Sequence, residues 1–180
     1  MMILLIMTLV TGVIYPLTVI GIAQLVFPFQ ANGSLMEVDG QVVGSALIGQ
    51  NFSDPRYFWS RPSASDYDPM PSAGSNLSPT SKKLLEQVQQ REQTLRTIYG
   101  LPADYELPSD LLFASGSGLD PHISSASARL QIIRVARARN LKEAQVAALV
   151  EQYTEPRQFG LLGEPRVNVL LLNIALDRLQ

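Results

Sequence analysis

MILLIMTLVTGVIYPLTVIGIAQLVF, residues 2–27, is a nearly continuous apolar run that determines how the rest of the chain is organised. No side chain before Glu37 carries a charge. As a helix rising 1.5 Å per residue, the run would reach roughly 35–40 Å, which exceeds the ~30 Å hydrocarbon core of a bilayer. We therefore predict a transmembrane anchor helix over residues 1–29, followed by a single domain over residues 30–180.

A cleaved secretory signal and a buried core helix are the alternatives to a retained membrane helix. The apolar region of a signal usually has about 7–15 residues and ends at a small-residue cleavage site. This run is longer, and the segment VFPFQ at residues 26–30 contains no Ala-x-Ala. A core helix would have to be buried on every side. A retained, single-pass helix is therefore favoured.

The charges that flank the helix predict its orientation. Lys and Arg within about 15–20 residues of a helix end favour the cytoplasmic side. Beyond the helix, the nearest charges are Glu37 and Asp39, and the first basic residue is Arg56. The exit side has no retaining cations, which predicts a cytoplasmic N-terminus and an extracytoplasmic domain at the cell inner (plasma) membrane.

Within the helix, small residues and a proline suggest a packing face. Thr8 and Gly12 are spaced as small-xxx-small, and Pro16 removes a backbone hydrogen bond. A neighbouring membrane helix could approach closely along this face. The alternative is that such residues are common in membrane helices in general.

Composition excludes several classes of function. The chain of 180 residues has a formal net charge of −2 and no run of basic residues, which argues against nucleic-acid binding. It has no cysteine, and therefore neither a disulfide nor a thiolate metal site. A single histidine, His122, rules out a multi-histidine metal site, so we predict no bound metal.

Apolar periodicity and capping residues predict a mixed α+β domain. Residues 35–43 fit a β-hairpin on an Asp39-Gly40 turn. Ser78, as N-cap, and Pro79 would begin a helix that Gly100 ends. Further helices are expected at residues 124–139, capped by Ser124 or Ser125 and ended by Asn140, at 142–152, and at 169–179 with Asn168 as N-cap, although residues 166–170 also fit a strand.

The segment GSALIG, residues 44–49, has the glycine spacing of a phosphate loop. Such a loop needs Lys and then Ser or Thr next, whereas this chain has Gln50-Asn51. Nucleotide binding in that mode is therefore not expected, and the glycines are interpreted as relieving a bend after a strand.

The stretch ASGSGLDPHIS, residues 114–124, brings together serines, an aspartate and the single histidine. A membrane-anchored hydrolase could use only Ser117, Asp120 and His122, but no G-x-S-x-G elbow is present, and Asp120 and His122 lie too close in sequence for a normal triad. An ordered loop, or a contact with a partner or ligand, is the favoured interpretation. Two arginines at i,i+3, Arg134 and Arg137, share a helix face that could reach this loop or hold an anion, although a solvated or salt-bridged face is favoured.

Four segments in this order after one membrane helix carry a resemblance: YFWSRPS at 57–63, GSNLSPT at 74–80, ASGSGLDPHIS at 114–124 and LGEPRVNVL at 162–170. The chain resembles, over essentially its whole length, the C-subunit family of the bacterial Kdp potassium-transporting P-type ATPases. The resemblance implies a non-catalytic accessory subunit, needed for assembly and activity of a high-affinity potassium uptake pump. The implied partners are the channel-like potassium-translocating subunit and the ATP-hydrolysing subunit, together with the lipid membrane.

Two mechanisms follow from the resemblance. The family is described as a catalytic chaperone that raises the ATP affinity of the catalytic subunit, which makes ATP the implied cofactor. An exported domain has no access to cytoplasmic ATP, so the favoured mechanism is an extracytoplasmic lid near the potassium entrance. The partner or ligand candidates are Tyr57, Arg61, Ser63, Ser75, Asn76, Ser115, Ser117, Asp120, His122, Arg134, Arg137, Glu164, Arg166 and Asn168.

Overall fold

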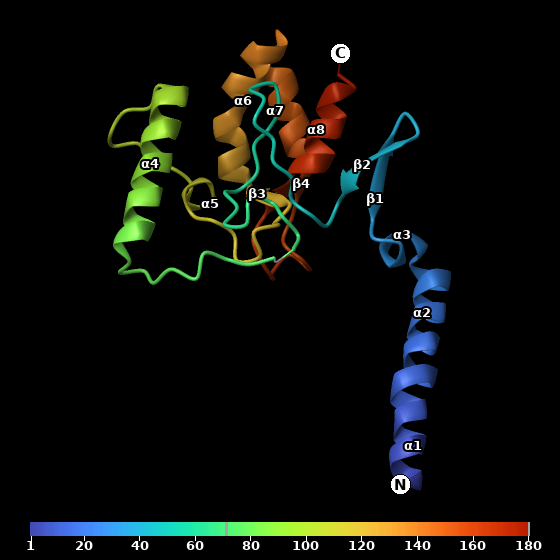
Figure 1. Ribbon diagram of the computed structural model, residues 1–180. Coiled ribbons are helices and arrows are strands. Elements are labelled where there is room, and N and C mark those ends of the chain that lie inside the picture. The colour runs from blue at the N-terminus through green and yellow to red at the C-terminus, as the bar shows by residue number, and fades with distance from the viewer. Residues whose placement is uncertain (71, 180) are drawn as a thin grey trace. The chain divides into compact units, whose positions relative to one another are not determined.

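The computed structural model describes residues 1–70 and 72–179 and confirms the α+β class. The chain divides into two compact units, Met1–Leu47 and Ile48–Gln180. The first is the blue helix and the hairpin that follows it in Figure 1, and the second contains the other elements.

The first unit begins with one helical run of 25 residues, Met2–Val26, none of which is buried. It consists of α1 (Met2–Leu9), the π-helical segment η1 (Val10–Ile14) and α2 (Tyr15–Val26). Its length and composition suffice to cross a membrane.

A proline and three threonines mark the interior of this run. The π-helical segment lies in the turn before Pro16, whose missing N–H removes a hydrogen bond from the helix. The hydroxyls of Thr8, Thr11 and Thr18 donate to carbonyls four residues earlier. No atom lies within 4 Å of a Cβ placed on Gly12. The packing face formed by Thr8, Gly12 and Pro16 is therefore open to a neighbour, and its use stays a prediction.

A short helix, α3 (Pro28–Ala31), leads to the hairpin of β1 (Leu35–Val38) and β2 (Gln41–Ser45). The strands pair antiparallel, with Val38 opposite Gln41. Asp39 and Gly40 have φ values of +52° and +76°, as a two-residue type I′ turn requires. The predicted hairpin is confirmed.

The described part of the second unit contains five helices and a small sheet, and three of the helices pack with the sheet. Its elements are α4 (Lys82–Tyr99), α5 (Ser109–Leu112), β3 (His122–Ser124), α6 (Ser125–Arg139), α7 (Glu143–Gln152), β4 (Thr154–Glu155), β5 (Arg166–Asn168) and α8 (Val169–Asp177). The sheet is antiparallel in the order β3-β5-β4, with His122 opposite Asn168 and Thr154 opposite Val167. Helices α6, α7 and α8 lie together, and α4 stands to one side of α6 (Figure 1).

The core lies between these three helices and the sheet. Its buried side chains include Ile123, Val135, Val146, Val167, Leu172 and Leu176. Phe58, which belongs to the long loop before α4, is also fully buried there. The loop is therefore part of the core.

Most predicted helix boundaries are confirmed. The Ser124 hydroxyl caps α6 by accepting from the N–H of Ser127 at 3.1 Å, and Asn140 ends α6 with a φ of +56°. Asn168 caps α8 by accepting from the N–H of Leu171 at 3.2 Å. Residues 166–168 form β5, so the strand alternative is confirmed for these residues and was wrong for Val169 and Leu170, which begin α8.

The predicted start of the helix before Gly100 was wrong. Helix α4 begins at Lys82, four residues after the predicted cap, with Ser81 at the N-cap position. The N–H of Ser81 donates to the carbonyl of Ser78 at 2.9 Å, and the Ser78 hydroxyl accepts from the N–H of Thr80 at 3.3 Å. These bonds close a separate turn that the helix does not continue. Gly100, with a φ of +63°, ends the helix as predicted.

Candidate functional site

Two amide side chains hold the long loop between helices α6 and α8. Asn173 accepts from the N–H of Phe58 at 2.8 Å and donates to its carbonyl at 3.0 Å. Gln131 accepts from the N–H of Trp59 at 2.7 Å and donates to its carbonyl at 3.2 Å. Both amides are almost fully buried. They satisfy consecutive loop residues as a neighbouring strand would.

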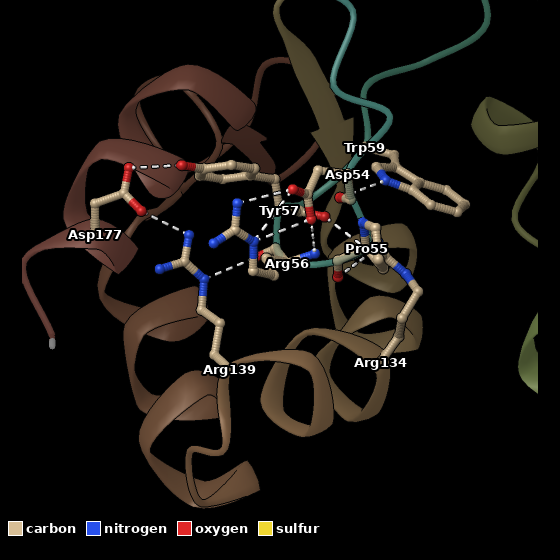
Figure 2. A network of polar contacts seen from close by, with 8 residues as sticks. All are labelled: Asp54, Pro55, Arg56, Tyr57, Trp59, Arg134, Arg139 and Asp177. Atoms are coloured by element: carbon tan, nitrogen blue, oxygen red, sulfur yellow. Dashed lines mark hydrogen bonds and ion pairs between the residues drawn. The ribbon is translucent and has the colours of Figure 1, made fainter.

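Arg134 fixes the same loop from α6 (Figure 2). Its Nη1 donates to the carbonyls of Pro55 at 2.6 Å and Tyr57 at 3.0 Å, and its Nε donates to the hydroxyl of Tyr99 at 3.1 Å. The guanidinium lies 3.9 Å from the centre of the Trp59 ring, a cation–π contact. Burial lowers the pKa of Arg134. The Arg134 guanidinium therefore bonds to groups of the chain itself and links α6 to the loop.

Arg139, near the end of α6, makes a second anchor for the loop. Its Nη2 lies 2.6 Å from Asp177 Oδ1, and its Nε donates to the carbonyl of Arg56 at 2.7 Å. The hydroxyl of Tyr57 donates to Asp177 Oδ2 at 3.1 Å, and Arg139 stacks on the Tyr57 ring at 4.7 Å (Figure 2). The predicted candidate Tyr57 is therefore part of a structural network that joins the loop to α6 and α8.

Arg137, predicted to share a face with Arg134, is not brought into these networks. Its side chain is exposed, and it makes no ion pair or hydrogen bond with any residue that the structure describes. Both arginines line a groove of about 420 Å³, and the holding of an anion by this pair stays a prediction.

Arg61, Asp120 and His122 meet in a third cluster. Arg61 Nη1 lies 2.8 Å from Asp120 Oδ2. Asp120 Oδ1 accepts from the N–H of His122 at 3.0 Å, and His122 Nδ1 lies 3.6 Å from the same oxygen. Burial alone would raise the pKa of Asp120, but the His122 contacts together with Arg61 lower it to about 2. Arg61 and Asp120, both partner or ligand candidates from the sequence, are therefore paired with each other.

This cluster predicts a pH dependence of stability. The folded pKa of Asp120 is about 2, below its ordinary value of 3.8, so its contribution is complete above pH 3.8 and is lost as the pH falls toward 2. We expect Asp120→Asn to lower the free energy of unfolding at pH 7 by about 1–2 kcal/mol, because the pair is partly exposed to solvent. Urea unfolding of both proteins at pH 7 and pH 2.5 measures the difference. An equal difference at both pH values would contradict the assignment.

The serines near this cluster support the loops. Ser117 Oγ accepts from the N–H of Leu119 at 3.1 Å, and the N–H of the buried Ser115 donates to the carbonyl of Pro62 at 3.1 Å. Across residues 1–70 and 72–179, no hydrogen bond joins Ser117 to His122. The arrangement that a Ser-His-Asp hydrolase requires is therefore not assembled by these residues.

The remaining candidates lie in turns and at strand ends. Ser63 Oγ accepts from the N–H of Tyr67 at 2.9 Å, and Ser75 Oγ accepts from the N–H of Leu77 at 3.5 Å. Asn76 has a φ of +52°. On β5 and beside it, Arg166 pairs with Glu155 at 2.9 Å and Glu164 with Arg157 at 2.6 Å.

The second glycine of the GSALIG segment, Gly49, lies where two loops approach closely. Its N–H donates to the carbonyl of Leu119 at 2.8 Å, and a Cβ at this position would lie 2.5 Å from the carbonyl oxygen of Asp120. The glycine is therefore required by close approach of two loops, as expected when a side chain has no room.

Gly49→Ala should destabilise the second unit by about 1–3 kcal/mol, because the backbone it meets cannot move aside as a flexible side chain would. Gly116→Ala is the matched control, since no atom lies within 4 Å of its Cβ position. Thermal unfolding followed by circular dichroism compares the two. Equal melting temperatures for both variants would contradict this account of Gly49.

Several of the residues that organise the loops were missed by sequence reasoning. Gln131 lies between Leu130 and Ile132, and Asn173 follows three leucines. A polar residue at a core-facing helical position was the available signal, because a buried amide must find partners. Arg139 and Asp177 gave no comparable signal, since charged residues at helix ends are common on surfaces. No group of three or more potential metal ligands (His, Cys, Asp or Glu) occurs among the described residues.

Comparison with known proteins identifies the family. The family model for KdpC, described as "K+-transporting ATPase, c chain", matches residues 1–178. A potassium-transporting ATPase KdpC subunit of Methylococcus capsulatus is 57% identical, with 100% of this chain and 96% of the relative covered. The subunits of Gemmatimonas aurantiaca and Mycobacterium bovis are 57% and 53% identical, covering 95% and 98% of this chain and 86% and 94% of those relatives. The chain therefore belongs to the KdpC family, the c-chain subunits of potassium-transporting ATPases.

Proposed function

We propose that this accessory subunit of a potassium pump places its second unit outside the cytoplasm, as a lid near the potassium entrance. Its partners there are the channel-like subunit and, within the same pump, the ATP-hydrolysing subunit. The chain contributes assembly and access control, while the chemistry of ATP hydrolysis belongs to its partner.

The charge distribution around the membrane helix carries this proposal. The helical run Met2–Val26 is uncharged, and the first charges beyond it are Glu37 and Asp39. Export of the following domain is the orientation that the positive-inside rule favours. An exported domain meets potassium before the pump does, and it does not meet cytoplasmic ATP.

The use of the polar residues supports a non-catalytic role. Arg134 and Arg139 donate hydrogen bonds to loop carbonyls, and Asp120 forms an ion pair with Arg61. Gly49, in the segment that resembles a phosphate loop, is explained by packing against Asp120. These contacts hold the loops against the helices, which suits a lid that must keep one shape.

The two mechanisms differ in which affinity the domain controls. The assembled pump is reconstituted with the full chain or with a chain that ends at Leu47, and ATP hydrolysis is titrated with potassium and with ATP. A lid predicts a change of about fivefold or more in apparent potassium affinity, with ATP affinity nearly unchanged. A loss of ATP affinity with unchanged potassium affinity would favour the nucleotide-binding chaperone instead.

A further inference from the structure

The connection between β4 and β5 ends in an exposed apolar tip, residues 158–163. Phe159, Leu161 and Leu162 have 93%, 80% and 59% of their surface exposed. The tip contains no charged residue and consists of these three side chains with Gln158, Gly160 and Gly163. Exposed large apolar side chains gathered in one place mark a surface that another molecule covers.

Backbone hydrogen bonds give the tip a fixed shape. Gln158 and Leu162 exchange two N–H to carbonyl bonds, each 2.9 Å long. The N–H of Gly160 also donates to the carbonyl of Arg157 at 3.0 Å. Phe159 has a φ of +54°, which bulky residues rarely adopt. The fold thus holds an aromatic residue in a strained conformation while leaving its ring in solvent.

The charges at the base of the tip are already paired. Arg157 bonds Glu164 at 2.6 Å, and Arg166 bonds Glu155 at 2.9 Å. Within each pair the positive charge of the arginine is balanced by the negative charge of the glutamate, so these two pairs add no net charge at the base. A groove of about 560 Å³ reaches the same base and is lined by Ile132, Ala147, Val150, Pro156 and Pro165, with Arg129 and Glu151 also on its walls. An apolar projection and a groove with a mainly apolar lining therefore adjoin on one face of the second unit.

We propose that this tip is a docking element that inserts into an apolar recess of another subunit of the same pump. The inference rests on the proposed function, which supplies the partner. A recess of defined shape explains the strain at Phe159, because preorganisation lowers the entropic cost of binding to a fixed surface. A lipid surface has no fixed shape and would accept a relaxed loop equally well. The self-paired base also suits contact with a protein rather than attraction to anionic headgroups.

Labelling of a single cysteine tests the occupant directly. The chain has no cysteine of its own, so Leu161→Cys introduces a unique thiol. Met70→Cys is the matched control, since Met70 is 81% exposed in the same unit. The rate of reaction with a water-soluble maleimide is measured for the full chain alone in liposomes and for the assembled pump.

The proposal predicts that Leu161→Cys reacts as fast as Met70→Cys in the chain alone. In the assembled pump its labelling rate should fall by about tenfold or more, because labelling then requires the interface to open. Slow labelling of the chain alone would assign the tip to lipid and overturn the proposal. Fast labelling in the pump would overturn it as well. Potassium-dependent ATP hydrolysis of the same preparation tests the proposed function separately.

Truncation of the tip gives a second measurement. The double variant Phe159→Ala, Leu161→Ala should weaken retention of the chain by the other subunits about tenfold or more, as loss of buried aromatic and aliphatic anchors does. Met70→Ala should leave retention unchanged. Equal retention of both variants, with equal melting temperatures, would contradict the docking role.

Discussion

Asn173→Leu is expected to lower the free energy of unfolding of the second unit by about 3 kcal/mol. The substitution keeps a side chain of similar branched shape but removes both hydrogen bonds to Phe58, a residue that is fully buried. A backbone donor and a backbone acceptor then remain inside the protein without partners, and each costs about 1–3 kcal/mol. Urea unfolding of the full chain in detergent, followed by fluorescence, measures the change.

The reporter and the control for this experiment lie within the chain. Trp59 is its one tryptophan and is adjacent to Phe58, so its emission follows the state of the loop. Gln89→Leu makes a comparable polar-to-apolar change at an exposed position of α4. The midpoint should fall for Asn173→Leu at constant denaturant dependence and stay within about 0.5 kcal/mol of the original for Gln89→Leu. Equal midpoints would show that the Asn173 amide does not hold the loop.

Arg134→Met should cost about 4 kcal/mol, the largest effect expected of a single substitution here. The change leaves the carbonyls of Pro55 and Tyr57 without their charged donor and removes the cation–π contact with Trp59. Hydrogen bonds from charged donors contribute about 1.5–3 kcal/mol each, which sets this scale. The emission of Trp59 should change in the folded protein too, because the guanidinium lies against its ring.

Arg137→Met is the control, one turn further along α6. Both changes remove one positive charge, but Arg137 is exposed and has no bonded partner among the described residues. Its replacement should change stability by less than about 0.5 kcal/mol. Arg134→Lys should recover only part of the loss, since an ammonium cannot reproduce a planar guanidinium with several donors. Equal effects at Arg134 and Arg137 would contradict the network in Figure 2.

Local signals predicted most of the helices because their causes are local. Ser124 and Asn168 cap the helices that follow them, and Asn140 and Gly100 end helices with positive φ. Each rests on a bond or a backbone preference within a few residues. The start of α4 was missed because Ser78 and Pro79 fit a turn as well as a cap.

The sheet and the clusters depend on contacts that no local pattern contains. Strands β3 and β5 have three residues each, too few for alternation to be visible. The bonds from Gln131 and Asn173 to the loop join residues 72 and 115 positions apart. Arg61 and Asp120 were both candidates from the sequence, but their pairing across 59 positions required the fold.

The sidedness of the second unit is the most direct test of a lid outside the cytoplasm. Gln93→Cys places one thiol on the exposed surface of α4 in a chain that has no other cysteine. Intact cells are treated with a membrane-impermeant thiol reagent, and lysed cells serve as the reference for complete labelling. The account predicts full labelling of intact cells. Protection in intact cells, with labelling only after lysis, would place the domain beside cytoplasmic ATP and contradict the lid.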